Sequence, residues 1–326
     1  MKAVITGSNG FIGSHLSGRL ARGGWDVISL VRPGSDTHLL NGSDVTIRSV
    51  SYADGNALAS AIEGSDCLFH VAGLTRGRSA REYTLANTEL TGQLLDVCLR
   101  LNTPPKRFVY LSSLTAAGPS PGEPYQDETC TPRPVDDYGS SKLAAERLLT
   151  ERASGIPVTI IRPPAVFGPG DRNLLPLFRT ARRLRAVPVV GRPSRRISFV
   201  DVRDLVEGIL LSSAASTARG RIYYIAGGTR TMRDISETVA EALSIPPRIV
   251  SLPPLLARLA GEFGELKWTL TGKPQILSRR KIRDMLRDGW TCDWSKAGRE
   301  LDYRPRFQLR ETMRDTADWY RRTGLL

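Results

Sequence analysis

The stretch Thr6-Gly7-Ser8-Asn9-Gly10-Phe11-Ile12-Gly13 decides the fold, because it joins a short apolar run, residues 2–6, to a helix-length segment, residues 12–22. Glycines at such a junction let the backbone turn tightly, let a pyrophosphate approach the main chain and let the helix pack close to the sheet. The phosphates would then lie at the positive N-terminal end of that helix. Glycine triplets are common in turns, but this position, directly after the first strand, predicts a dinucleotide-binding turn.

The first half of the chain alternates short apolar runs with helix-length segments. Further runs that predict strands cover residues 26–31, 45–50, 67–71, 107–111 and 158–162. Helical segments between them cover residues 57–62, 84–101 and 138–152. Buried strands that alternate with helices predict an α/β fold, specifically a Rossmann-type doubly wound parallel sheet.

After residue 162 the pattern changes, since prolines and glycines cluster first and helices with Pro-rich turns follow. We interpret this half as a smaller, mainly helical C-terminal substrate domain. The expected dinucleotide-binding domain is residues 1–165, and the chain returns to it at about residues 197–227. The expected substrate-binding domain is residues 166–326.

The chain is strongly basic, with a net charge of +13 and a pI near 10.0. Nucleic acid, an anionic membrane surface, an anionic substrate and a solvated arginine-rich surface are the competing explanations. The basic clusters are Arg179-Arg182-Arg183-Arg185, Arg195-Arg196 and Arg279-Arg280-Lys281-Arg283. Because they are not interleaved with aromatic residues and no nucleic-acid module is visible, a solvated surface is favoured and no nucleic-acid partner is expected.

Neither a metal nor a membrane-spanning segment is expected. The four cysteines and three histidines are scattered without ligand spacing, which indicates neither a zinc site nor a disulfide framework. The longest apolar runs are strand-sized, and no charged-then-apolar leader precedes the first strand. The cytoplasm is the expected location.

The segment Tyr138-Gly139-Ser140-Ser141-Lys142 predicts a catalytic pair. Residues four apart lie on one helix face, and an ammonium beside a phenol favours the phenolate, so Tyr138 can exchange a proton near neutral pH. Ser113 ends the strand at residues 107–111, and ligands gather at the carboxyl ends of strands in such sheets. Its hydroxyl is expected to orient the substrate oxygen beside Tyr138.

The G-x-x-G-x-x-G spacing, with Tyr138 and Lys142, resembles the extended short-chain dehydrogenase/reductase superfamily over nearly the whole chain. Its NAD-dependent epimerase/dehydratase-like members include a 3β-hydroxysteroid dehydrogenase- and dihydroflavonol reductase-like branch. The resemblance implies hydride transfer to or from a carbon bearing oxygen, with Ser113, Tyr138 and Lys142 as catalytic residues. The implied cofactor-binding residues are Gly7, Asn9, Gly10, Phe11, Ile12, Gly13, Arg32, Asp54, Ala72, Gly73, Asn87, Tyr138 and Lys142.

Three of these residues have a second interpretation each. Arg32 stands next to the position where an acidic residue would bond the ribose of NAD, and a guanidinium there can pair with a 2′-phosphate. NADP(H) is therefore favoured over NAD(H), unless Arg32 only ends its strand in solvent. Asp54 resembles the acid that contacts adenine, and it is also placed to cap the helix before Ala57. Asn87 either contacts the cofactor or braces its helix.

The substrate is harder to predict. Leu114 and Thr115 stand where sugar-nucleotide 4,6-dehydratases carry Asp-Glu, which disfavours a dehydratase. The position of the diphosphate-binding arginine of sugar-nucleotide epimerases falls on Ile197, with Arg196 one residue off, and one residue on a strand reverses the face. The candidate substrate-binding residues are Thr115, Phe167 and Arg196.

The favoured function is therefore an NAD(P)-dependent oxidoreductase for a ketone or secondary alcohol, with a hydrophobic compound as one option. A sugar-nucleotide epimerase is the alternative, and a non-enzymatic dinucleotide sensor is less favoured because the catalytic residues are intact. The resemblance implies a homodimer through residues 84–101 and 138–152. An apolar stripe at residues 252–268 either packs in the core, lines a pocket or touches a membrane surface.

Overall fold

The computed structural model describes residues 1–120, 122–123, 125–271, 282–283 and 286–326. Its largest sheet has seven strands in the order β10-β6-β5-β4-β1-β2-β3, and each neighbouring pair is parallel. The order turns back between β1 and β4, as in a doubly wound sheet. The strands are β1 (Lys2–Thr6), β2 (Asp26–Val31), β3 (Thr46–Ser49), β4 (Cys67–His70), β5 (Phe108–Leu111), β6 (Val158–Arg162) and β10 (Arg221–Tyr224). The predicted Rossmann-type sheet is confirmed.

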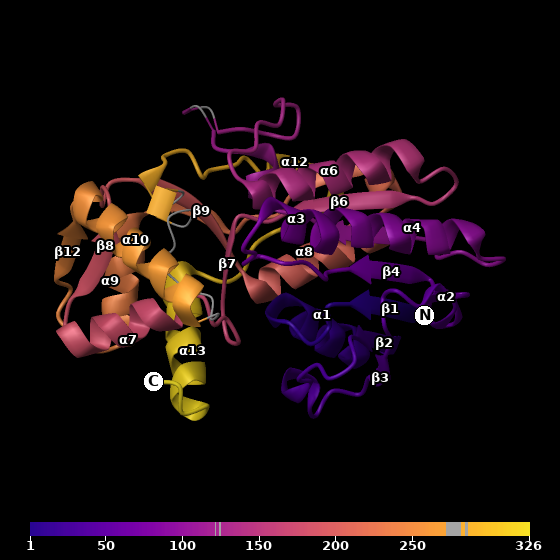
Figure 1. Cartoon of the computed structure of the whole chain (residues 1–326), viewed down its shortest axis with the longest axis horizontal. Coiled ribbons are helices and arrows are strands. Elements are labelled where there is room, and N and C mark those ends of the chain that lie inside the picture. Colours follow the sequence, from indigo (N-terminus) through magenta and orange to yellow (C-terminus); the bar gives the residue numbers. More distant parts are fainter. Residues whose placement is uncertain (121, 124, 272–281, 284–285) are drawn as a thin grey trace.

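Both faces of this sheet are covered by hydrophobic clusters except at the edge strand β3, whose residues are exposed, and consecutive strand residues point to opposite faces. Ala3 and Ile5 of β1 pack in one hydrophobic cluster, and Val4 between them packs in the other. The helices on the first face are α1 (Phe11–Arg22), α8 (Val202–Ala214) and α12 (Ser295–Leu301). The helices on the second face are α2 (Gly55–Ile62), α4 (Leu90–Arg100) and α6 (Asp137–Arg152) (Figure 1).

The rest of the chain forms a second lobe with two small sheets (Figure 1). One sheet has the order β11-β9-β7, and the other pairs β12 with β8. Their strands are β7 (Ala165–Phe167), β8 (Val187–Val190), β9 (Arg196–Asp201), β11 (Gly228–Thr231) and β12 (Ile249–Leu252). The helices there are α7 (Leu175–Leu184), α9 (Met232–Ala242), α10 (Pro254–Thr271) and α13 (Leu309–Arg322). A mainly helical C-terminal part is thus present.

Within the expected returning segment, residues 197–227, the two strands have different destinations. Strand β10 joins the large sheet beside β6, whereas β9 lies in the small sheet between β11 and β7. The domain limits at residues 165 and 166 remain a proposal.

Several short elements complete the chain. Helix α3 (Ala80–Tyr83), a π-helical turn η2 (Thr84–Glu89) and α4 follow one another without a break. A single helical turn α5 (Leu114–Ala117) follows β5. Two 3₁₀ turns, η1 (His38–Leu40) and η3 (Ser216–Ala218), lie in connections.

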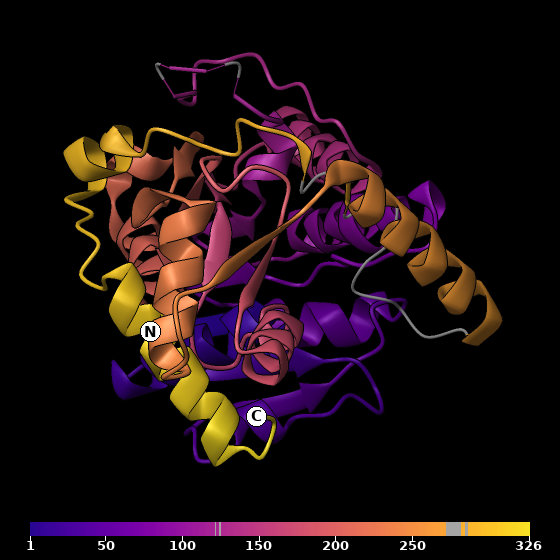
Figure 2. The ribbon, with the colours of Figure 1, turned by 90° about the vertical axis from the view of Figure 1, so that its left-hand side faces the viewer.

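The apolar stripe predicted at residues 252–268 lies mostly on α10, which extends away from the rest of the chain (Figure 2). Leu255, Leu256, Leu259 and Phe263 are exposed, so the core interpretation is wrong for these residues. The side chains of residues 264–268, and the basic residues 279–281, lie outside what the structure describes. None of the helices in the described residues combines the length and the apolar content needed to cross a bilayer.

Candidate functional site

The glycine-rich turn has the geometry that the sequence predicts for it. Gly7 has a φ of 71°, and the Gly10 amide donates to the Gly7 carbonyl oxygen over 3.1 Å. A Cβ on Gly13 would lie only 2.1 Å from that oxygen, so the helix can pack this close only without a side chain. Helix α1 starts at Phe11 with no side-chain cap and no acidic residue in its first turn. Its amide groups therefore suit an anionic phosphate.

The turn after β4 lies directly against the glycine-rich turn. The Ala72 amide donates to the Thr6 hydroxyl over 3.3 Å, and a Cβ on Gly7 would meet the Ala72 nitrogen at 2.6 Å. A Cβ on Gly73 would lie 3.1 Å from Lys142 Nζ. The two turns and Lys142 thus form one continuous surface at the carboxyl ends of β1, β4 and β5.

Asn87 is buried in the π-helical turn η2 and holds this surface together. Its Oδ1 accepts from the Leu74 amide over 2.7 Å, and its Nδ2 donates to the Leu74 carbonyl oxygen over 3.1 Å. Nδ2 also lies 2.9 Å from the Ser141 hydroxyl of α6. These contacts match the bracing role predicted for Asn87, while contact with a cofactor stays a prediction.

The three predicted catalytic residues converge because α5 and α6 pack tightly. Ser113 caps α5, and its Oγ accepts from the Thr115 amide over 3.2 Å and from the Thr115 hydroxyl over 2.9 Å. A Cβ on Gly139 would lie 2.3 Å from the Thr115 carbonyl oxygen, so glycine lets the first turn of α6 approach α5. This approach places Tyr138 close enough to Ser113 for the Ser113 hydroxyl to influence its phenol.

Burial dominates the electrostatics of Tyr138 and Lys142. It raises the pKa of Tyr138 to about 12, opposite to the near-neutral value predicted from the Lys142 charge, because burial outweighs the lowering effect of Ser113. It lowers the pKa of Lys142 to about 8, against the opposing charge of Glu146. Lys142 Nζ donates to the Leu111 carbonyl oxygen over 2.8 Å. The Lys142 ammonium is therefore held in place at the end of β5, and it gains or loses its proton near pH 8.

The remaining predicted cofactor residues follow the first three strands of the chain. Asn9 Nδ2 donates to the Asp36 carbonyl oxygen over 3.0 Å, and Ile12 packs against the core on the α1 face. Arg32 is exposed directly after β2. Asp54 caps α2 by accepting from the amides of Asn56 and Ala57, as predicted, and its contact with adenine stays a prediction.

Two of the predicted substrate-binding residues have protein partners. The Phe167 ring is buried and stacks on the Phe199 ring with centroids 6.2 Å apart. Arg196 is exposed at the start of β9, and its Nη1 lies 2.9 Å from Glu123 Oε1 and 3.0 Å from the Tyr125 hydroxyl. A substrate diphosphate at Arg196 would have to displace Glu123.

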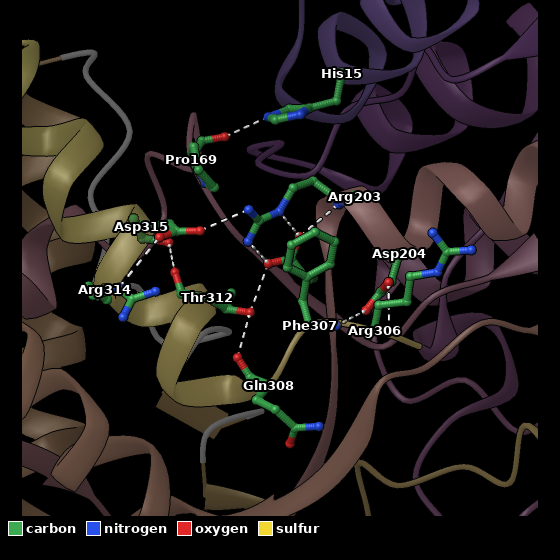
Figure 3. Close-up of polar contacts among 12 residues, drawn as sticks. His15, Pro169, Arg203, Asp204, Arg306, Phe307, Gln308, Thr312, Arg314 and Asp315 are labelled. Carbon is green, nitrogen blue, oxygen red and sulfur yellow. Dashed lines mark hydrogen bonds and ion pairs between the residues drawn. The ribbon is translucent and has the colours of Figure 1, made fainter. Parts of the chain in front are cut away.

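A polar junction fixes the loop after β7 beside α1 (Figure 3). His15 Nε2 lies 2.7 Å from the Pro169 carbonyl oxygen, and the pKa of His15 is lowered mainly by burial. Nearby, Arg203 Nη1 donates to Asp315 of α13 over 2.8 Å, and its guanidinium lies 3.6 Å from the centre of the Phe307 ring. The second lobe is thereby tied to the helix that starts at the glycine-rich turn.

The sequence analysis assigned no catalytic or binding role to three residues around the predicted catalytic group. The Tyr83 ring packs against the Tyr138 ring with centroids 5.9 Å apart, and no sequence pattern indicates this contact. Glu146 and Arg162 form a buried ion pair next to Lys142. Glu146 could have been found, because it follows Lys142 by four residues and so lies on the same helix face.

The site as a whole suits a dinucleotide and an acid–base reaction. The glycine-rich turn before α1, whose helix has no side-chain cap, fits a pyrophosphate, and the Ser113, Tyr138 and Lys142 group lies further along the same edge of the sheet. No group of three or more His, Cys, Asp or Glu side chains in the described residues is arranged to hold a metal ion.

Comparison with known proteins agrees with this geometry. The model of the NAD dependent epimerase/dehydratase family matches residues 3–226. The chain is 28% identical to a ceramide reductase of Caulobacter vibrioides, over 99% of this chain and 95% of the relative. It is 27% identical to a 3 beta-hydroxysteroid dehydrogenase/Delta 5-->4-isomerase of Mycobacterium tuberculosis, over 98% of this chain and 90% of the relative.

A solved structure of MoeE5 in complex with UDP-glucuronic acid and NAD superimposes with a TM-score of 0.76. It is 25% identical to this chain, and the match covers 99% of this chain and 100% of that one. Since the family model spans the glycine-rich turn, Ser113, Tyr138 and Lys142, the chain belongs to the NAD dependent epimerase/dehydratase family and is an NAD(P)-dependent enzyme of the extended short-chain dehydrogenase/reductase superfamily.

Proposed function

We propose that the chain is an NAD(P)(H)-dependent oxidoreductase that interconverts a ketone and a secondary alcohol on a hydrophobic substrate. The observation that carries the proposal is that Ser113 and Tyr138 lie next to each other, near the buried Lys142 ammonium. A proton donor, a second hydroxyl and a fixed positive charge are the groups that this reaction needs around the reacting oxygen.

In the proposed mechanism the protein handles the proton. A bound nicotinamide supplies or accepts the hydride at the reacting carbon. Ser113 donates a hydrogen bond to the substrate oxygen and orients it. Tyr138 gives that oxygen a proton during reduction and removes one during oxidation, and the charge of Lys142 makes the phenol a better acid.

Two observations favour a hydrophobic substrate over a sugar nucleotide. Arg196, the arginine nearest to the expected diphosphate position, is engaged with Glu123. The ceramide reductase and hydroxysteroid dehydrogenase relatives are named for apolar substrates. The MoeE5 complex with UDP-glucuronic acid keeps the sugar-nucleotide epimerase as the second candidate.

The substitution Tyr138→Phe tests the mechanism. We expect turnover to fall by about a hundredfold to ten-thousandfold, because general acid–base catalysis contributes that much. Affinity for NADH and NADPH should be nearly unchanged, since the ring remains. Nicotinamide absorbance follows turnover of a long-chain keto-lipid and a steroid 3-alcohol, and chromatography of the sugar nucleotide follows epimerisation of UDP-glucose, which leaves the cofactor without net change.

Tyr83→Phe is the matched control, because it removes a hydroxyl from the ring that packs on Tyr138. It should retain most of the turnover. Full activity of the Tyr138→Phe protein would contradict the mechanism. If the purified protein releases NAD on denaturation and epimerises UDP-glucose, the epimerase is the function. If the wild type binds the cofactor but converts none of the substrates, a dinucleotide sensor is favoured.

The finer features of the site are proposed on the same basis. NADP(H) is the proposed preferred cofactor because Arg32 is exposed at the end of β2, with NAD(H) as the alternative. Thr115 and Phe167 are proposed to contact the substrate. A homodimer through α4 and α6, and a cytoplasmic location, remain predictions.

A further inference from the structure

A buried ion pair lies behind the proposed catalytic group. Glu146 and Arg162 are 2% and 1% exposed. Arg162 Nε donates to Glu146 Oε1 over 2.9 Å, and Arg162 Nη2 donates to Glu146 Oε2 over 2.5 Å. Burying two charges costs free energy even when they pair, so the pair is weak evidence for a role in stability alone.

The partners of Glu146 belong to the elements that carry the catalytic residues. The Ser112 hydroxyl donates to Glu146 Oε1, and Ser112 stands between Leu111, whose carbonyl accepts from Lys142, and Ser113. On α6, Glu146 follows Lys142 by one helical turn and Tyr138 by two. Its carboxylate thus connects the end of β5, the end of β6 and the catalytic face of α6.

The groups around Lys142 leave Glu146 as its anionic neighbour. His70 of β4 is neutral because burial lowers its pKa to about 3. The centre of the Tyr110 ring on β5 lies 4.7 Å from Lys142 Nζ, and burial raises the pKa of the Tyr110 phenol well above its usual value. Tyr138 is also a neutral phenol at ordinary pH. Burial alone lowers the pKa of Lys142, and Glu146 opposes this effect.

We propose that Glu146 is a positioning residue that keeps the Lys142 ammonium charged and that Arg162 limits this effect. The inference rests on the roles proposed above for Tyr138 and Lys142. Ser112, in this view, orients the carboxylate without supplying charge.

The charge of Lys142 can be measured directly by NMR without a substrate. The chain has seven lysines, so ε-¹³C-lysine labelling gives few signals, and Lys142→Arg identifies the one of interest. In the wild type the Lys142 signal should titrate near pH 8. In Glu146→Gln the midpoint should fall by about one unit or more, because a nearby opposite charge is lost. In Arg162→Gln it should rise, because Glu146 then acts on Lys142 unopposed.

Opposite shifts from the two halves of one ion pair are the decisive result, since general loosening of the site would move both midpoints the same way. Ser112→Ala is the matched control, and its midpoint should match the wild type because the carboxylate remains. An unchanged midpoint in Glu146→Gln, or shifts of one sign in both variants, would overturn the inference.

An unpaired buried charge can also prevent folding. The double variant Glu146→Gln with Arg162→Gln removes both charges, and its Lys142 midpoint should still lie below the wild-type value, because Glu146 is the charge that acts on Lys142. A double-variant midpoint equal to that of the wild type overturns the inference. Failure of the proposed function is a separate result, since it would appear as turnover retained in Tyr138→Phe.

Discussion

At the scale of single residues, the proposed preference for NADP(H) rests on Arg32. Its exposed guanidinium follows β2, where the ribose of the adenosine is expected. We expect Arg32→Ala to weaken NADPH binding by about tenfold to a hundredfold, since a charge-assisted bond is worth about 1.5–3 kcal/mol. NADH binding should change little.

Titration of each variant with both cofactors by intrinsic fluorescence measures the two affinities. Arg22→Ala, which removes a guanidinium from the far end of α1, controls for the loss of positive charge. Equal losses for NADH and NADPH would mean that Arg32 does not recognise the 2′-phosphate.

The buried Lys142 also predicts how turnover depends on pH. Tyr138 keeps its proton over the working range, because burial raises its pKa to about 12. Lys142 is charged below its pKa of about 8 and loses its charge as the pH rises through that value. The rate of ketone reduction should therefore be level below pH 8 and fall above it, which a pH–rate profile of kcat measures. A rate that stays level to about pH 10, two units above this pKa, would contradict the role of Lys142.

The sequence predicted the proposed catalytic residues but not the ion pair next to them. Ser113, Tyr138 and Lys142 are recognisable because their spacing is local and their chemistry is specific. Glu146 and Arg162 carry charges, which usually lie in solvent, and only the packing of α6 on β6 shows that they are buried together.

At the scale of elements, the first strand, turn and helix form one unit that depends on Gly13. A methyl group there would collide with the Gly7 carbonyl oxygen, so Gly13→Ala must move α1 away from β1. We expect a loss of about 1–3 kcal/mol in the free energy of unfolding and at least tenfold weaker dinucleotide binding. Urea unfolding and cofactor titration measure the two effects.

The control for this change is Gly55→Ala at the start of α2. A Cβ there has nothing within 4 Å, so stability and cofactor binding should both be preserved. Wild-type cofactor affinity in Gly13→Ala would show that the close contact between α1 and the turn is not needed for binding.

The first six strands of the large sheet were predicted with limits close to those observed, because all but the exposed edge strand β3 are buried parallel strands, which form continuous apolar runs. The sequence did not predict which of the sheets each strand joins. Strand β9 has the same apolar character as β10, yet it pairs with β7 and with β11, which lies 27 or more residues further along the chain. Such pairing depends on tertiary neighbours rather than on the strand itself.

At the scale of the whole molecule, the chain combines a strongly positive net charge with an exposed apolar face on helix α10. Leu255, Leu256, Leu259 and Phe263 fall within about 100° of one another on α10. Each is about half exposed or more, whereas Ala257 on the other side of the helix is buried. The sequence predicted this stripe but not its exposure, because helical spacing is the same for a core face and for a surface face.

We propose that this face binds the surface of an anionic bilayer, from which a hydrophobic substrate would enter. The net charge of +13 attracts such a surface, and the apolar side chains can enter its interfacial region. The protein should therefore co-sediment with vesicles of phosphatidylglycerol and phosphatidylcholine, less with pure phosphatidylcholine, and less at high salt. Leu255→Ser with Phe263→Ser should weaken binding by about tenfold or more, because each buried apolar side chain contributes about 1.5–3 kcal/mol.

Ile47→Ser is the matched control, since Ile47 is an exposed apolar residue on β3 at the edge of the large sheet. It should leave vesicle binding unchanged. Binding that is equal for the double variant and the wild type would assign it to charge alone. If the double variant instead lost a dimer that forms without lipid, α10 would be an interface between two copies of the chain, and the bilayer proposal would be wrong. Sedimentation velocity without vesicles distinguishes these two outcomes, because a dimer interface needs no lipid to form.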